Sequence, residues 1–262
     1  MNITLLANHD IASNLALNLL LPKLKDHRIT VYLSSRVGKV GTKPQALEAL
    51  QSFERALLQS LSDVSDSHTS TDSRLQSFSA LGRLIGRPIN TLNHINSLAG
   101  QSILAADKPD LIVSIRYGVI LRQPVIALPR HGIINLHSGP LPDYRGVMAS
   151  FWGLLNGASE LGTTLHYIDD SSIDTGRIIS TTRLPVDRQR SYLWHVLNLY
   201  PDGCKTIIKN IELLHFGEPV NCKPQPPVGT YHTFPTDADL GRFFKQGLKL
   251  FDSDVQSLLS CP

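Results

Sequence analysis

Two apolar runs near the start of the chain, Ile3-Thr4-Leu5-Leu6-Ala7 and Ile29-Thr30-Val31-Tyr32-Leu33, have the length and composition of buried strands. Residues 11–24, which lie between them, carry apolar side chains at helical spacing. A strand, a helix and a second strand in this order are typical of a β-α-β unit with parallel strands. The start of the chain therefore predicts an α/β fold with a doubly wound, mostly parallel sheet.

Strand-like and helix-like segments continue to alternate along the rest of the chain. The patterns predict strands at residues 111–115, 133–136 and 164–168, helices at 45–61, 97–106 and 149–156, one long helix at 192–212, and an exposed polar loop at 62–73.

A proline-rich stretch, residues 220–227, breaks regular structure near the end of the chain. We therefore expect a main domain at residues 1–218 and a short extension at 219–262. The extension should contain an extended piece at 231–235 and a helix at 237–246. Its apolar side chains indicate that it packs on the main domain or on a second subunit, as in a homodimer.

The composition is that of an ordinary globular protein, with 262 residues, 42% hydrophobic residues and a net charge of +3. No apolar stretch approaches the roughly 20 residues needed to span a membrane, and the first residues lack the features of a signal peptide. The three cysteines are odd in number and lack metal-ligand spacing, which favours reduced thiols, a cytoplasmic protein and no metal site. The weak positive charge fits an anionic ligand but not nucleic acid.

Three polar residues follow apolar, strand-like runs in the middle of the chain. Asn135 and His137 lie two residues apart, so their side chains share one face if the run is a strand. Asp174 lies in the loop Ile173-Asp174-Thr175-Gly176. An amide can stabilise an oxyanion, an imidazole can transfer a proton, and a carboxylate can orient the imidazole. The three together predict acyl transfer to a nitrogen, whereas each residue alone is also compatible with a capping or turn-forming role.

The region from residue 110 to residue 179 resembles the folate-dependent formyltransferases. The resemblance rests on the ordered motifs Asp110-Leu111-Ile112-Val113, Tyr117-Gly118-Val119-Ile120-Leu121, Asn-x-His-Ser-x-x-Leu-Pro-x-Tyr-Arg-Gly from Asn135, Asn156-Gly157, Leu161-Gly162-Thr163-Thr164 and Ile173-Asp174-Thr175-Gly176. It implies that Asn135, His137 and Asp174 are catalytic and that 10-formyltetrahydrofolate is the co-substrate.

The resemblance also implies a pterin pocket with two walls. For any single side chain there, a plain strand-to-loop edge is the alternative interpretation. The expected cofactor-binding residues are Arg116, Tyr117, Gly118, Val119, Ile120 and Leu121 on one wall and Ile168, Asp169 and Asp170 on the other.

On the acceptor side we expect His9, Asp10, Tyr144 and Arg145. Asp10 is alternatively a helix N-cap, and Arg145 either binds a substrate anion or is a structural cation of its loop. The loop at residues 7–14 has no glycine, so it lacks the close backbone approach with which the nucleotide-type transformylases hold a phosphate. The sequence His137-Ser138-Gly139-Pro140 also departs from the family by placing its proline later.

These features together predict an N-formyltransferase acting on a small-molecule amine, either an amino-sugar nucleotide or a hydroxyornithine-like siderophore precursor. The rivals are a methionyl-tRNA formyltransferase, a 10-formyltetrahydrofolate hydrolase and a non-catalytic folate-binding module. We expect no nucleic-acid partner, because the extension is too short for a tRNA-binding barrel. Arg36, Lys39 and Lys43 are the candidates for a basic loop.

Overall fold

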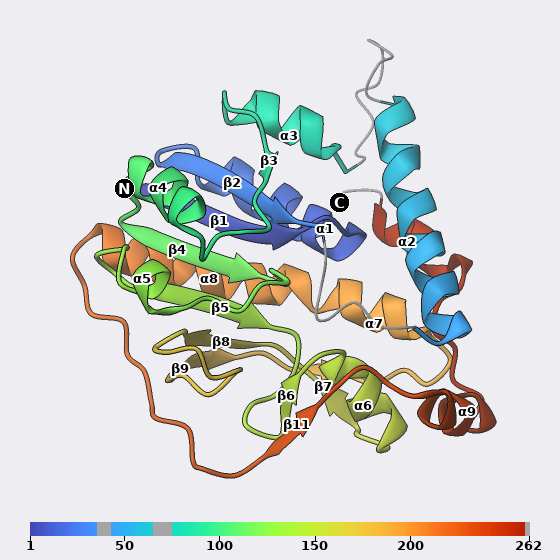
Figure 1. Cartoon of the computed structure of the whole chain (residues 1–262). Helices are drawn as coiled ribbons and strands as arrows, with labels where there is room; N and C mark the ends of the chain where they lie inside the picture. The colour runs from blue at the N-terminus through green and yellow to red at the C-terminus, as the bar shows by residue number, and fades with distance from the viewer. Residues whose placement is uncertain (36–42, 65–74, 260–262) are drawn as a thin grey trace.

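The computed structural model describes residues 1–35, 43–64 and 75–259. Within these ranges, seven strands form one sheet in the order β3-β2-β1-β4-β5-β8-β9 (Figure 1). The strands from β3 to β5 are parallel, and β8 and β9 are antiparallel additions at one edge. The α/β class with a mostly parallel sheet is therefore confirmed. The bounds of these strands are β1 Asn2–Asn8, β2 Arg28–Ser34, β3 Asn90–Thr91, β4 Leu111–Ile115, β5 Ile133–His137, β8 Thr164–Tyr167 and β9 Ile178–Thr181.

The parallel strands are buried on both faces, so their side chains alternate between two apolar cores. In β1, Leu5 and Ala7 belong to the larger core and Leu6 to the smaller one. In β4, Val113 and Ile112 divide in the same way. The covering helices are α1 Ile11–Leu20, α2 Gln45–Val64, α3 Phe78–Leu84, α4 Leu98–Ala106, α5 Gln123–Ile126, α6 Ala149–Leu155, α7 Tyr192–Asn198 and α8 Tyr200–His215.

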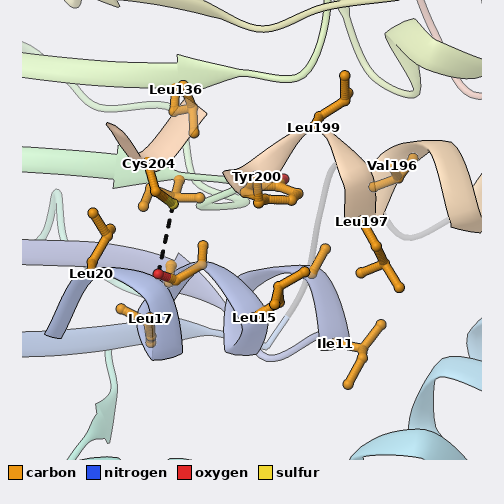
Figure 2. Packing of buried hydrophobic residues seen from close by; sticks show 14 of the residues in the cluster. Ile11, Leu15, Leu17, Leu20, Leu136, Val196, Leu197, Leu199, Tyr200 and Cys204 are labelled. Carbon is orange, nitrogen blue, oxygen red and sulfur yellow. Dashed lines mark hydrogen bonds between the residues drawn. The ribbon is translucent and has the colours of Figure 1, made fainter. Parts of the chain in front are cut away.

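Helix α8 packs directly against the sheet and against α1 (Figure 2). A Cβ atom added to Gly203 would lie 2.9 Å from Leu136 Cδ2, so this position needs a residue without a side chain. The next residue is Cys204, whose buried thiol donates to the Ala16 carbonyl at 3.8 Å. Burial raises the pKa of this thiol well above its ordinary value. Cys204 is therefore a packing residue rather than a nucleophile.

The end of the chain contributes to the main core. Leu240 and Phe243 on α9 (Asp237–Lys245), together with Leu248 and Leu250, are buried in the same apolar cluster as β1 and α1. The remaining short elements are β6 Tyr144–Gly146, β7 Glu160–Leu161, β10 Leu184–Pro185, β11 Thr230–His232 and the 3-10 helices Leu21–Lys23 and Ser253–Leu259. Of these, β11 pairs in parallel with β6 in a two-stranded sheet.

Proline shortens two of the helices that the sequence predicts. The prediction of a single helix at residues 192–212 is wrong, because two helices meet at Leu199, two residues before Pro201. The helix expected at residues 11–24 ends at Leu20 and continues as a 3-10 turn that contains Pro22. Proline has no N–H to donate to the carbonyl four residues earlier, so the helical ladder is interrupted at both places.

The polar segment and the basic loop coincide largely with residues that the structure does not describe. Helix α2 continues to Val64, so the loop expected at 62–73 starts later than the sequence indicates. Arg36 and Lys39 lie outside the described residues. Lys43 is described, and its Nζ lies 5.7 Å from the centre of the Phe234 ring. None of the helices in the described ranges is long and apolar enough to cross a membrane.

Candidate active site

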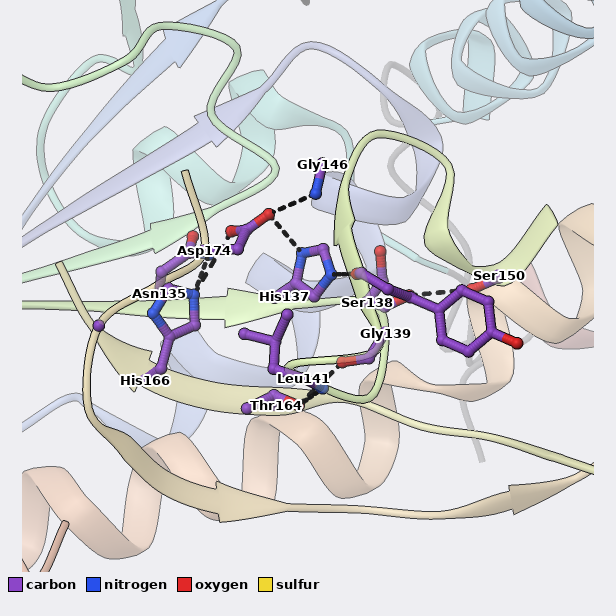
Figure 3. A network of polar contacts seen from close by, with 12 residues as sticks. Asn135, His137, Ser138, Gly139, Leu141, Gly146, Ser150, Thr164, His166 and Asp174 are labelled. Carbon is purple, nitrogen blue, oxygen red and sulfur yellow. Dashed lines mark hydrogen bonds and ion pairs between the residues drawn. The ribbon is translucent and has the colours of Figure 1, made fainter. Parts of the chain in front are cut away.

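The polar residues of the predicted site meet at the carboxyl end of β5. Asn135 and His137 lie on this strand, and the register with β8 places Asn135 opposite His166. The loop between β8 and β9 returns across the strand and brings Asp174 to both histidines (Figure 3). The fold therefore brings the three predicted catalytic residues together and adds His166 to them.

Asn135 is attached to His166 by its amide. Its Nδ2 lies 3.1 Å from His166 Nε2, and His166 Nδ1 donates to the Tyr167 carbonyl at 2.8 Å. Because Nδ1 carries that proton, Nε2 of the neutral ring accepts from the Asn135 amide. His166 Nε2 also lies 3.5 Å from Asp174 Oδ1. His166 thus fixes the orientation of the amide and faces the carboxylate.

His137 is held at both ring nitrogens. Nε2 donates to the Tyr144 carbonyl at 2.6 Å, so Nδ1 is the nitrogen that gains or loses a proton. Nδ1 lies 3.5 Å from Asp174 Oδ2. A Cβ atom on Gly139 would lie 2.9 Å from His137 Nε2, so the glycine after Ser138 gives the ring its space. The imidazole is therefore aimed at the carboxylate by the loop that follows β5.

Asp174 is the centre of the cluster, and its side chain is 10% exposed. Burial pushes its pKa up, but His137, His166 and the Gly146 N–H, which donates at 2.8 Å, outweigh burial and lower the pKa to about 2. Its backbone has a φ of +55°, a left-handed conformation that Asp adopts more easily than most residues. The carboxylate is therefore ionised in the working range of pH and is ready to stabilise a protonated imidazole.

A second buried carboxylate lies at the ends of β1 and β4. Asp10 caps α1 by accepting from the Ser13 N–H at 2.7 Å, and it also accepts from Asn8 Nδ2 and Arg116 Nε, both at 2.8 Å. Arg116 has a φ of +57°, which turns its side chain back across the end of β1. These two residues, which the sequence divides between acceptor and cofactor, are thus paired with each other.

The other predicted cofactor-binding residues lie in two loops. In the loop after β4, Leu121 is buried in the smaller core, Ile120 is 53% exposed, the Gly118 N–H donates to Ser34 Oγ, and the Tyr117 hydroxyl donates to the Leu92 carbonyl. Among the described residues, the N–H and carbonyl of Val119 have no hydrogen-bond partner.

In the loop after β8, Ile168 packs against the smaller core. Asp169 is exposed and pairs with Arg177 at 2.7 Å, and Asp170 accepts from the Ser172 N–H. Ile168, Asp169 and Arg177 also border a surface hollow with Tyr167. That hollow does not include Asn135, His137, His166 or Asp174.

The residues expected to bind the acceptor are dispersed. His9 is exposed beside Phe78, with ring centres 5.2 Å apart. Tyr144 stacks on His232, and its carbonyl is the partner of His137. Arg145 donates to the Val228 carbonyl. Across the described ranges, no group of three or more His, Cys, Asp or Glu side chains is placed to hold a metal ion.

His166 is the member of the cluster that sequence reasoning missed. It interrupts an otherwise apolar strand, and a buried histidine in that position needs polar partners. A signal was available in the pattern of the strand: antiparallel pairing with β5 places His166 opposite Asn135. The register that produces this pairing depends on the return of the chain through α6 and is not visible in local sequence.

A family model described as "Formyl transferase" matches residues 92–193, which contain the whole cluster. A methionyl-tRNA formyltransferase of Geobacter sulfurreducens is 35% identical over 125 residues, which are 47% of this chain and 38% of that protein. A methionyl-tRNA formyltransferase of Alkaliphilus oremlandii is 31% identical over 156 residues, which are 60% of this chain and 47% of that protein. The matched part thus spans less than half the length of these curated relatives.

Solved structures share the fold over most of the chain. Glycinamide ribonucleotide transformylase 1 from Symbiobacterium toebii has a TM-score of 0.57 and 17% identity, covering 86% of this chain and 93% of that one. The formyltransferase PseJ from Anoxybacillus kamchatkensis, in complex with UDP-4,6-dideoxy-4-formamido-L-AltNAc and tetrahydrofolate, has a TM-score of 0.51 and 18% identity, covering 98% of both chains. At these identities the likeness concerns the fold.

Proposed function

We propose that the chain is a folate-dependent formyltransferase, which the matching family model and the similar methionyl-tRNA formyltransferases support, and that it transfers a formyl group from 10-formyltetrahydrofolate to the amine of a small molecule. The observation that carries the proposal is the Asp174 carboxylate, which lies 3.5 Å from His137 Nδ1 and 3.5 Å from His166 Nε2. Asn135 lies beside this pair through its bond to His166. The arrangement provides an oxyanion donor and a proton carrier within one cluster.

Transfer needs no oxidant or reductant. When bound, the folate supplies a formyl carbon that bonds to the attacking amine nitrogen as its bond to N10 breaks, and one proton passes from the amine to N10. Asn135 donates an amide N–H to the negative charge that develops on the formyl oxygen. His137 moves the proton through Nδ1, since Nε2 stays bound to the Tyr144 carbonyl. Asp174 stabilises the imidazolium while His137 carries that proton.

The loop after β4 fits a flat heterocycle. Val119 offers a backbone donor and acceptor, and Ile120 offers an exposed apolar surface. A reduced pterin needs both, because its polar edge pairs with backbone groups and its faces need apolar contact. Residues 117–121 and the loop at 168–173 would hold it. Folates occur in solved relatives of this fold, such as the PseJ complex with tetrahydrofolate.

For the acceptor, we favour an amino-sugar nucleotide or a hydroxyornithine-like amine. The PseJ complex holds a formamido sugar nucleotide, and its fold matches this chain from end to end. The charges of the C-terminal segment also favour a small acceptor. Arg242 pairs with Asp239 at 2.7 Å and Lys249 with Asp252 at 2.8 Å, so these cations offer no concentrated phosphate-binding patch.

Methionyl-tRNA is the second candidate acceptor. It is favoured by the curated relatives, since those of Geobacter sulfurreducens and Alkaliphilus oremlandii are methionyl-tRNA formyltransferases. A tRNA-directed enzyme would use the same cluster for the chemistry but would need a surface that binds tRNA around it. The two candidates therefore differ in the acceptor and agree on the chemistry.

An acceptor screen separates the candidates. The protein is incubated with 10-formyltetrahydrofolate and a panel of amino-sugar nucleotides, hydroxyornithine and methionyl-tRNA. Folate absorbance, N-formyl product and free formate are then recorded. We expect folate consumption that depends on a small amine and equals the N-formyl product, with His137→Ala as the background. Efficient formylation of methionyl-tRNA would replace the acceptor, and equal formate release without any amine would make the protein a hydrolase.

A further inference from the structure

A segment near the end of the chain, residues 222–234, contacts the Asp174 loop and strand β6 and is called the strap below. In Figure 1 it runs from the end of α8 past β9 to β11, beside β6. Lys223 and Ile178 exchange backbone hydrogen bonds, both of 2.7 Å, and β11 pairs with β6. The strap therefore touches β9, which follows the Asp174 loop, and β6, which follows the His137 loop.

Gln225 is the strap residue that reaches the Asp174 loop. Its Nε2 donates to the Asp174 carbonyl at 3.0 Å and to the Gly176 carbonyl at 2.6 Å. Its Oε1 is buried and has no partner among the described residues. The two carbonyl acceptors fix the orientation of the amide, because a flip would press Oε1 against two oxygens.

The Asp174 loop needs such a contact. Asp174 has left-handed backbone geometry, which is costly for a residue with a side chain. Gly176 approaches the Tyr167 carbonyl so closely that a Cβ atom would lie 1.8 Å from it. Residues 169–172, in contrast, are exposed. Gln225 thus binds the backbone of the loop on both sides of its most constrained turn.

The strap also supports the other half of the site. The His232 ring lies between Tyr144 and Trp152, with ring centres 5.6 Å and 4.8 Å apart. The Val147 N–H donates to the His232 carbonyl at 3.0 Å. Strand β6 in turn provides the Tyr144 carbonyl for His137 and the Gly146 N–H for Asp174. One segment therefore contacts the backbone that holds both ends of the His137–Asp174 pair.

We propose that Gln225 is a positioning residue for formyl transfer, which holds the Asp174 loop so that the carboxylate lies between the two imidazoles. This inference rests on the proposed function for its kinetic part. Gln225 has no role in binding the acceptor. Its substitution therefore lowers kcat and leaves the KM of the amine unchanged.

The test compares Gln225→Glu and Gln225→Ala with the control Gln246→Ala. Gln246 also donates from Nε2 to a backbone carbonyl, that of Leu155 at 3.0 Å, but away from the cluster. Gln225→Glu keeps the size of the side chain and replaces the donor by an oxygen that repels both carbonyls. We expect kcat to fall by about tenfold to a hundredfold in both Gln225 variants, as for a displaced catalytic group, with amine KM unchanged and Gln246→Ala near wild type.

Hydrogen exchange of the whole protein provides the readout that does not depend on the reaction. The peptide that covers residues 168–177 should exchange faster in both Gln225 variants, and peptides from β1 and β4 should not change. Equal exchange at 168–177 in wild type and Gln225→Glu, or a kcat for that variant equal to that of Gln246→Ala, would overturn the proposal. If the wild-type protein transfers no formyl group, the proposed function is refuted. The exchange comparison alone then tests whether Gln225 holds the Asp174 loop.

Discussion

Two carboxylates lie buried at the same edge of the sheet, and they are held in different ways. Asp10, at the end of β1, pairs with Arg116 Nε at 2.8 Å. Asp174, opposite the end of β5, faces His137 and His166, each at 3.5 Å. Both sites use a residue with left-handed backbone geometry, Arg116 in one and Asp174 in the other. In each site, a residue in an unfavourable backbone conformation therefore positions a charged side chain.

The partners decide what each carboxylate does. Burial raises the pKa of Asp10, but Arg116, Asn8 and the Ser13 N–H bring the pKa below its ordinary value. An arginine keeps its charge at any working pH, so this pair has one state and joins the end of β4 to the start of α1. An imidazole can accept a proton and pass it on during a reaction. We therefore expect the Asp174 site to take part in proton transfer and the Asp10 site to support the fold.

The largest expected effect concerns the His137 imidazole. Replacing His137 by Ala removes the proton carrier, so kcat should fall about a thousandfold. Asn135→Ala should cost about a hundredfold or more, since it removes the oxyanion donor. Steady-state kinetics with the amine found in the screen measures both changes. Turnover near wild type in either variant would remove that residue from the proposed chemistry.

Asp10→Asn should act on stability and not on the chemistry. It leaves the Arg116 guanidinium without its buried partner, which should lower the free energy of unfolding by about 3 kcal/mol. Urea denaturation measures the loss, and kcat of the folded fraction should stay within a few-fold of wild type. A stable Asp10→Asn protein that has lost affinity for the amine would instead make Asp10 an acceptor-binding residue.

The third prediction concerns stability in acid. Asp174 has a pKa of about 2 in the folded protein against an ordinary value of 3.8, so its ionised form stabilises the fold. The contribution is roughly 2 kcal/mol, is fully present above about pH 5, and is lost as the pH falls through 2. Unfolding free energies measured across this range should fall less steeply in Asp174→Asn. Identical slopes in the two proteins would contradict the placement of the carboxylate.

The smallest effect should come from Glu54, a half-buried carboxyl near the Asp10–Arg116 pair. Burial and the charge of Asp10 raise its pKa to about 7, and they outweigh the opposing effect of Arg116 and Lys43. A raised carboxyl pKa makes the fold less stable as the pH rises from about 4.5 to 7. Glu54→Gln should therefore stabilise the protein by about 1 kcal/mol at pH 8 and hardly at all at pH 4. Equal stability at both values would contradict the prediction.

The two carboxylate sites also differ in how much of their structure can be predicted from the sequence. Asn135 and His137 were predicted to share a face because strand periodicity is a local property, and β5 confirms that geometry. The pairing of Asp10 with Arg116 joins residues 106 positions apart, and it depends on the order of β1 and β4 in the sheet.

The missed contacts in the catalytic cluster have the same cause. His166 reaches the cluster through antiparallel register, and Gln225 reaches Asp174 through a segment 51 positions further along the chain. Patterns of a few residues predict helices, strands and the face of a strand on which a side chain lies. Contacts between distant segments follow from packing that no short window contains.

We expect the Asp174 cluster to perform the transfer and the Asp10 cluster to support the fold. The most direct measurement follows a ¹³C-labelled formyl group from 10-formyltetrahydrofolate to the amine, by NMR, in wild type, Asp174→Asn and Asp10→Asn at equal concentrations of folded protein. Labelled formamide should form at similar rates with wild type and Asp10→Asn, and almost none should form with Asp174→Asn. Transfer by Asp174→Asn at the wild-type rate would show that the Asp174 carboxylate is not needed for the reaction.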